Sequence, residues 1–310
     1  MRIVFIGQAP FGKDSLAALI QQGENIVGVI TVPDLPGQKR PNPVKALALE
    51  QGLPLLQPAK LKHPESVAWV RELKPDLLVL AFVTQFAPLE MIKSATHGGI
   101  NYHPSLLPKY RGGSAINWAV IRGERETGVT IHLIDEGVDT GPVILQEKVD
   151  ISPDDTVKSL YFEKLYPLGI NLIARAVALV REGKARPIPQ DESKVSFQPV
   201  ITESDTVINW KHSTQGVYDM IRGSNPSPGA VTTFEGRALK IWEAKPYPLQ
   251  GRAGDIIEIV EDRGFVVSTA DGGILVERVQ FDNVKLAAVD FSKSRGLRTG
   301  DRLGGVRKTG

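Results

Sequence analysis

The chain has 310 residues, of which 42% are hydrophobic and 23% charged, with a formal net charge of +2 and no cysteine. This length and apolar content allow one large domain or two ordinary ones with a sizeable core. The absence of cysteine excludes disulfides, thiolate nucleophiles and cysteine-ligated zinc, while the small charge neither requires nor excludes a nucleic-acid partner.

The N-terminal half alternates apolar strands with helices. Continuous apolar runs predict buried strands at 2–6, 26–32, 77–82, 100–103, 129–134 and 143–149. Helices are predicted at 13–22, 44–51, 64–73 and 114–122, and one long helix from 154 to about 182, kinked at Pro167 and Gly169. Strands of this kind, separated by helices, predict an α/β domain with a mainly parallel sheet covered on both faces.

The pattern changes in the C-terminal third. A loop with three prolines spans 183–199, a helix is predicted at 213–222, and short β-rich runs begin near Gly229. Glycine-containing turns at 235–236, 263–264 and 271–273 predict hairpins of a small β-barrel or curled sheet. We therefore expect an α/β domain over residues 1–205 and a small β-domain over residues 206–310.

The last 18 residues are basic, with six Lys or Arg against one Asp. A tail of this kind is usually a solvated end, although it could instead contact a phosphate backbone. No apolar run approaches the roughly 20 residues of a membrane helix, and the N-terminal run is too short for a signal peptide. We therefore expect a soluble, cytoplasmic protein without a membrane partner.

Three polar side chains suggest chemistry at a carbonyl group. Asn101 and His103 lie two residues apart, so on an extended segment both point to one face. A loop bounded by prolines follows at 104–108, and Asp139 lies on a later loop between two glycines. Asn can donate to an oxyanion, His can move a proton, and Asp can orient and charge the His. Both loops follow predicted strands, where parallel sheets bind ligands.

Other motifs favour structural roles. Residues 7–14 miss the phosphate-binding P-loop, because Asp14 stands where that motif needs Ser or Thr. His132 lies within an apolar strand pattern, which favours a buried structural histidine. No His pairs with another His or carboxylate at metal-ligand spacing, so no metal is expected. Asp135 or Glu136 could cap the turn that leads to Asp139.

With these residues identified, the chain resembles the folate-dependent formyltransferase family over nearly its whole length. The resemblance is carried by His-Pro-Ser-Leu-Leu-Pro at 103–108, Arg-Gly-Gly at 111–113 and Asp-x-Gly-x-Asp-Thr-Gly at 135–141. It implies a Rossmann-like catalytic domain followed by a C-terminal barrel of OB type. It also implies Asn101, His103 and Asp139 as the catalytic triad, with 10-formyltetrahydrofolate as co-substrate and no metal.

The same resemblance implies folate contacts from three segments. The residues are Phe82, Gln85, Phe86, Pro88 and Leu89, then Ser105, Leu106, Leu107 and Pro108, and finally Asp135, Gly137, Val138 and Gly141.

Two members of the family share further motifs with the chain. The hydrolase domain of 10-formyltetrahydrofolate dehydrogenase resembles it at 114–118 and 153–157, whereas methionyl-tRNA formyltransferase resembles it at 42–45. Asn101 stands where that hydrolase domain carries an aliphatic residue, which favours transfer. We expect formyl transfer to an amine, with initiator methionyl-tRNA as first choice and hydrolysis to formate and tetrahydrofolate as the alternative. A small amine such as an amino sugar, or a folate-sensing role without catalysis, also stays open, as does the oligomeric state.

Overall fold

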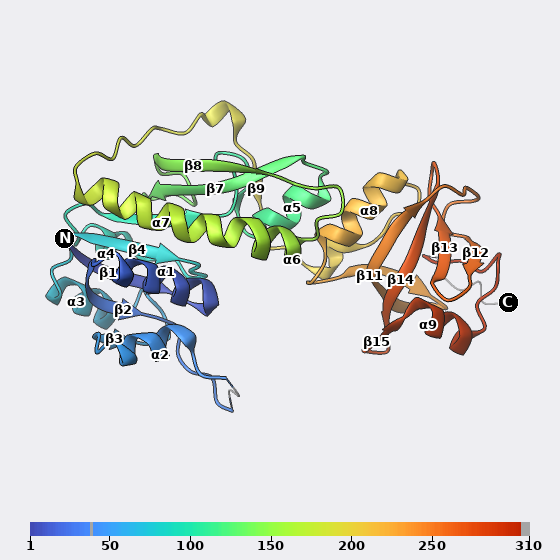
Figure 1. Cartoon of the computed structure of the whole chain (residues 1–310), viewed down its shortest axis with the longest axis horizontal. Coiled ribbons are helices and arrows are strands. Elements are labelled where there is room, and N and C mark those ends of the chain that lie inside the picture. Colours follow the sequence, from blue (N-terminus) through green and yellow to red (C-terminus); the bar gives the residue numbers. More distant parts are fainter. Residues whose placement is uncertain (38–39, 305–310) are drawn as a thin grey trace. The chain divides into compact units, whose positions relative to one another are not determined.

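The computed structural model describes residues 1–37 and 40–304 and divides into two compact units (Figure 1). The first unit comprises residues 1–112, 127–149 and 162–197. The second comprises residues 113–126, 150–161 and the chain from Gln198 on. In the part of the chain that is described, none of the helices has the length and apolar character needed to cross a membrane.

The first unit is built on a seven-stranded sheet with the strand order β3-β2-β1-β4-β5-β7-β8. Strands β1 to β5 pair in parallel, whereas β7 pairs antiparallel with β5. The mainly parallel sheet expected from the sequence is therefore confirmed. The strands are β1 (Arg2–Gly7), β2 (Asn25–Ile30), β3 (Leu55–Leu56), β4 (Leu77–Ala81), β5 (Gly99–His103), β7 (Glu126–Leu133) and β8 (Val143–Asp150).

The four helices predicted between these strands lie close to their expected positions, whereas the short helix α4 and the short strand β3 were not predicted. Helix α1 begins four residues early, because Pro10 occupies its first turn, where no N–H donor is needed. Asn42 caps α2 by accepting from the N–H groups of Val44 and Lys45. The N-terminal helices are α1 (Ala9–Gln21), α2 (Pro43–Glu50), α3 (Pro64–Glu72), α4 (Leu89–Ile92) and α5 (Ala115–Ile121).

The long helix predicted from 154 to 182 is interrupted. A short α6 (Val157–Ser159) leads into a π-helical segment, Leu160–Leu165, before α7 (Tyr166–Arg181). The irregular turns end just before Pro167, which has no N–H for a regular helical hydrogen bond. Four further short elements were not predicted, namely the strands β6 (Arg111–Gly112) and β9 (Phe197–Gln198) and the 3-10 turns Glu192–Lys194 and Glu203–Thr206.

Both faces of the sheet are covered by helices. On one face, apolar side chains of β1, β2 and β4 pack with those of α3 and α4. On the other face Tyr102 meets α7 so closely that a Cβ added to Gly169 would lie 2.4 Å from its ring. Side chains alternate along β5, so Asn101 and His103 share the face opposite Tyr102.

The second unit is an antiparallel β-domain, as the sequence predicts. Its sheet order is β10-β11-β14-β13-β12, with β15 paired to β14. Within residues 198–304 these ladders form an open path, so the structure records a six-stranded sheet and not a closed barrel. The elements are α8 (Thr214–Gly223), β10 (Ala230–Phe234), β11 (Arg237–Tyr247), β12 (Ile256–Val260), β13 (Gly264–Ser268), β14 (Gly273–Phe281), β15 (Val284–Ala287) and α9 (Ala288–Arg295).

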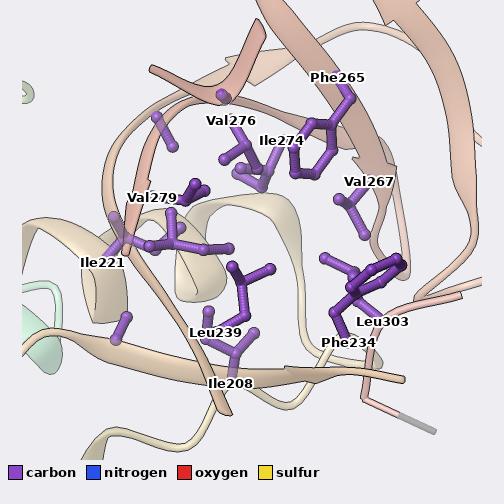
Figure 2. Packing of buried hydrophobic residues seen from close by; sticks show 14 of the residues in the cluster. Ile208, Ile221, Phe234, Leu239, Phe265, Val267, Ile274, Val276, Val279 and Leu303 are labelled. Atoms are coloured by element: carbon purple, nitrogen blue, oxygen red, sulfur yellow. The ribbon is translucent and has the colours of Figure 1, made fainter. Parts of the chain in front are cut away.

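The core of this domain lies between the sheet and helices α8 and α9. Figure 2 shows Ile221 of α8 in one cluster with side chains of the strands, among them Phe265 of β13 and Ile274 of β14. The basic C-terminal segment contributes to the same core, because Leu297 and Leu303 are buried and Arg302 donates to the Ala253 carbonyl at 2.8 Å. The segment up to residue 304 is therefore anchored by its apolar residues, while its described basic side chains, Lys293, Arg295, Arg298 and Arg302, are exposed as a solvated basic segment would be. Arg307 and Lys308 lie outside the described residues.

Candidate active site

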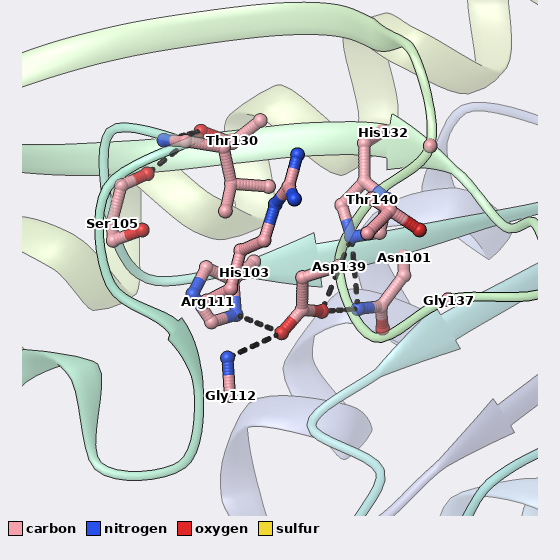
Figure 3. Close-up of polar contacts among 12 residues, drawn as sticks. Asn101, His103, Ser105, Arg111, Gly112, Thr130, His132, Gly137, Asp139 and Thr140 are labelled. Atoms are coloured by element: carbon pink, nitrogen blue, oxygen red, sulfur yellow. Dashed lines mark hydrogen bonds and ion pairs between the residues drawn. The ribbon is translucent and has the colours of Figure 1, made fainter. Parts of the chain in front are cut away.

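Strands β5 and β7 and the loop that follows β7 bring together a small group of polar side chains (Figure 3). Asn101 and His103 stand at the carboxyl end of β5. The antiparallel pairing of β5 with β7 places His132 opposite Asn101 and Thr130 opposite His103. The site therefore combines two residues that are neighbours in sequence with others brought in by sheet pairing.

Asp139 reaches this group from the loop that joins β7 to β8. Its backbone has a φ of +54°, which is left-handed and uncommon for a residue other than glycine. The loop is closed by Asp135, whose Oδ1 accepts from the Gly137 N–H at 3.1 Å and from the Thr140 hydroxyl. Asp135, predicted as a folate contact, thus caps the turn with its side chain.

Gly141 allows the loop to lie directly against β7. A Cβ added there would come within 1.8 Å of the Leu133 carbonyl oxygen, far inside van der Waals contact. Any side chain at this position would therefore push the backbone, and with it Asp139, away from the strand end.

The three predicted catalytic side chains meet. Oδ2 of Asp139 lies 3.3 Å from Nδ1 of His103 and accepts the Gly112 N–H at 2.9 Å. The Asn101 amide donates to Oδ1 of Asp139 at 3.4 Å. The side chains of His103 and Asp139 are only 6% and 12% exposed, so this contact is largely screened from water.

His103 is held at both ring nitrogens. Its Nε2 lies 2.7 Å from the Tyr110 carbonyl, which can only accept, so Nε2 carries a proton. Burial is the largest influence on the pKa of His103 and lowers it, whereas the Asp139 carboxylate and the Tyr110 carbonyl raise it. Asp139 therefore favours the charged imidazole, as expected, but the burial of the ring outweighs this effect and the net shift of the pKa is downward.

Asp139 stays ionised despite its burial. Burial raises its pKa, but a hydrogen bond with His132, the charge of His103 and the Gly112 N–H lower it more, to about 2. The site therefore keeps a carboxylate beside a buried imidazole near neutral pH.

His132 also belongs to this group, which the sequence did not predict. It is buried, as the strand pattern indicated, and its Nδ1 lies 2.7 Å from the Leu133 carbonyl. Its Nε2, however, lies 3.5 Å from Asp139 and 3.3 Å from the Asn101 amide nitrogen. The signal that could have found it is the β5–β7 register, which no local pattern contains.

Two of the residues predicted to contact folate, Ser105 and Leu107, take part in local hydrogen bonds. The Ser105 hydroxyl is buried and donates to the Lys109 carbonyl at 2.7 Å. The Thr130 hydroxyl donates to the Ser105 carbonyl at 2.7 Å and accepts the Leu107 N–H at 3.2 Å. These bonds order the loop that presents the Tyr110 carbonyl to His103.

The segment after β4 presents aromatic side chains to solvent. Phe82 has a φ of +59° and is 41% exposed, and Phe86 is 77% exposed. Gln85 is turned inward, where its amide accepts the Leu61 N–H at 2.9 Å and donates to the Ala59 carbonyl at 3.2 Å. Pro88 and Leu89 begin α4. Among the predicted contacts nearer the triad, Leu106, Pro108 and Val138 are half-buried.

No set of three His, Asp or Glu side chains among residues 1–37 and 40–304 is arranged to hold a metal ion. The polar group described above offers hydrogen-bond donors, two imidazoles and a carboxylate. This combination suits acyl transfer, in which an oxyanion is stabilised and a proton moves between two nitrogens.

Both halves of the chain match known families. Residues 1–177 match the model of formyl transferases, and residues 200–296 match the model of the formyl transferase C-terminal domain. A methionyl-tRNA formyltransferase of Geobacter metallireducens is 38% identical over 98% of this chain and 99% of its own length. Another, from Symbiobacterium thermophilum, is 39% identical over 98% of this chain and 95% of its own length.

The fold is also found in a solved structure. HypX from Aquifex aeolicus, crystallised with tetrahydrofolic acid, superposes with a TM-score of 0.68 at 21% identity. The match covers 94% of this chain and 47% of HypX.

Proposed function

This chain belongs to the formyl transferase family, and on that basis we propose that it transfers the formyl group of 10-formyltetrahydrofolate to the amino group of initiator methionyl-tRNA. The observation that carries the acceptor is the similarity to methionyl-tRNA formyltransferases, which spans both domains at 38% identity. The chemistry is supported by the polar group formed by Asn101, His103 and Asp139.

The reaction exchanges one amide bond for another. The amine nitrogen bonds to the formyl carbon, the carbonyl oxygen becomes an oxyanion, and the bond to N10 of the folate then breaks. The attacking amine loses one proton and N10 gains one, so neither an oxidant nor a metal is needed. Two tasks fall to the protein, namely stabilising the oxyanion and moving that proton.

Asp139 is suited to the proton transfer. Its pKa of about 2 keeps it an acceptor at neutral pH, and its Oδ2 lies beside the buried ring of His103. In our proposal Asp139 accepts the proton of the attacking amine, directly or through a water, and passes it to Nδ1 of His103. The charged ring then stabilises the oxyanion until the same proton is delivered to N10 of the folate as the bond to the formyl carbon breaks.

Asn101 is the neutral donor in this proposal. Its amide contact with Asp139 is 3.4 Å long, so a substrate oxygen with developing negative charge can compete for that proton. Removal of one such donor from an oxyanion site typically costs a factor of about 10²–10³ in turnover.

The decisive assay measures N-formyl-methionine on initiator tRNA with 10-formyltetrahydrofolate as donor. Elongator methionyl-tRNA serves as the matched control, and release of tetrahydrofolate is followed in the same reactions. Formylation of the initiator tRNA supports the proposal. Release of formate at the same rate with and without tRNA would identify a hydrolase, and formylation of an amino sugar alone would identify a different acceptor.

A further inference from the structure

A segment that follows α7 returns to the active site. Ile188 and Val143 exchange backbone hydrogen bonds of 2.8 and 2.9 Å, which attach this segment beside β8. Farther along, the Ser196 carbonyl accepts the Arg111 N–H at 2.9 Å, and the Ser196 N–H donates to the Pro108 carbonyl at 3.2 Å. Residues 188–196, which we call the return segment, are thus tied down at both ends.

Gln190 lies between these two attachments and contacts the Asp139 loop. Its side-chain nitrogen donates to the backbone carbonyls of Asp139 and Gly141, each at 2.8 Å. Its side-chain oxygen accepts from Arg111, at 3.1 Å from Nε and 2.8 Å from Nη2. The amide therefore uses both of its protons and its oxygen.

Arg111 fixes the orientation of that amide. Its side chain is 6% exposed and also donates to the two carboxylate oxygens of Glu192, at 3.2 and 2.7 Å. The next residue, Gly112, donates its N–H to the Asp139 carboxylate at 2.9 Å. Residues 111–112 thus hold the carboxylate of Asp139 directly, through the Gly112 N–H, and the backbone of Asp139 indirectly, through Arg111 and Gln190.

We propose that Gln190 is a positioning residue that holds the Asp139 loop in its left-handed conformation, with the carboxylate directed at His103. A non-glycine residue at a φ of +54° is held there only if its surroundings compensate for the strain. The two carbonyls that Gln190 binds are those of Asp139 itself and of Gly141, whose backbone lies tightly against Leu133 of β7. This inference rests on the catalytic role proposed above for Asp139.

The first test is the variant Gln190→Met, which keeps the length of the side chain and removes its donors and acceptor. We expect kcat for formylation to fall about tenfold to a hundredfold, because small displacements of a reacting group are costly. The KM values for folate and tRNA should change less than about threefold. The variant alters the position of Asp139 in the reaction and leaves unchanged the contacts that bind substrate and transition state equally. Gln250→Met is the matched control, because Gln250 also donates to a carbonyl, that of Ala270, within the second unit.

A double-mutant cycle separates positioning from general structural support. If Gln190 acts through the Asp139 carboxylate, then Asp139→Asn/Gln190→Met should have the kcat of Asp139→Asn alone. Single-turnover formylation measures these slow variants. Independent effects would instead multiply, and that result would overturn the proposal.

Gln190→Glu provides a second variant, because it keeps an acceptor for Arg111 and loses both donors. The same fall in kcat is expected from it. Wild-type kcat in either variant, a change confined to KM, or loss of the folded state in both would overturn the inference. Absence of formylation by the wild-type protein would instead overturn the proposed function, so the two failures are distinguishable.

Discussion

Nδ1 of His103 lies 3.3 Å from Oδ2 of Asp139, while Nε2 of the same ring faces the Tyr110 carbonyl. Both neighbours are hydrogen-bond acceptors, so only the doubly protonated ring can donate to both. Burial opposes that charge and lowers the pKa of His103. The ring is therefore set to gain a proton when negative charge develops nearby, as it does on the oxyanion of an acyl transfer.

Replacing Asp139 with Asn should nearly abolish formyl transfer while leaving the fold intact. The amide keeps the shape of the side chain but cannot accept the amine proton, so kcat should fall on the order of 10²- to 10⁴-fold. Formyl-methionine production and circular dichroism of the purified variant measure the two effects. Near-wild-type turnover in the folded variant would exclude this role for Asp139.

The same carboxylate should make stability depend on pH. Its folded pKa of about 2 lies below the reference value of 3.8, so ionised Asp139 stabilises the native state above about pH 3.8. The difference of roughly 1.8 units corresponds to about 2 kcal/mol, which is lost as the pH falls toward 2. Urea unfolding at pH 5 and pH 3 should therefore show about 1 kcal/mol more loss for wild type than for Asp139→Asn. Equal losses would contradict the depressed pKa.

Replacing His132 with Phe should impair catalysis although the sequence did not mark this residue. The phenyl ring would still fill the space beside β5 but has no ring nitrogen to pair with the Asp139 carboxylate or the Asn101 amide. We expect kcat to fall by about tenfold or more, as for loss of a partner that orients a catalytic group. His212→Phe, in the second unit, is the comparison variant. An unchanged kcat for His132→Phe would show that this residue has only a structural role.

Gly141→Ala should displace the Asp139 loop. Its Cβ would meet the Leu133 carbonyl oxygen, so the backbone must move at a cost of about 2–4 kcal/mol in unfolding free energy. Gly183→Ala is the control, because that glycine has a φ of +65° and open space around it, and only about 1–2 kcal/mol is expected. Thermal unfolding and turnover of both variants test this, and equal effects would argue against the close contact at Gly141.

Several features of this protein were determined by its sequence alone. The spacing of Asn101 and His103 is local, and a period of two along an extended strand places both on one face whatever the rest of the fold does. Apolar runs separated by helices likewise predicted the mainly parallel sheet, and the glycine-marked turns predicted the antiparallel β-domain. These patterns act over a few residues, where propensity and periodicity dominate.

Only the tertiary structure decided which distant residues complete the site. His132 reaches Asn101 because β7 runs antiparallel to β5, and Gln190 reaches Asp139 from 51 residues away. Burial of His103, which sets the direction of its pKa shift, also depends on the packed surroundings of the ring. Register between strands, the path of a returning segment and the loss of solvent around a side chain arise from long-range packing. A local sequence pattern does not encode them, because the same pattern is compatible with many such arrangements.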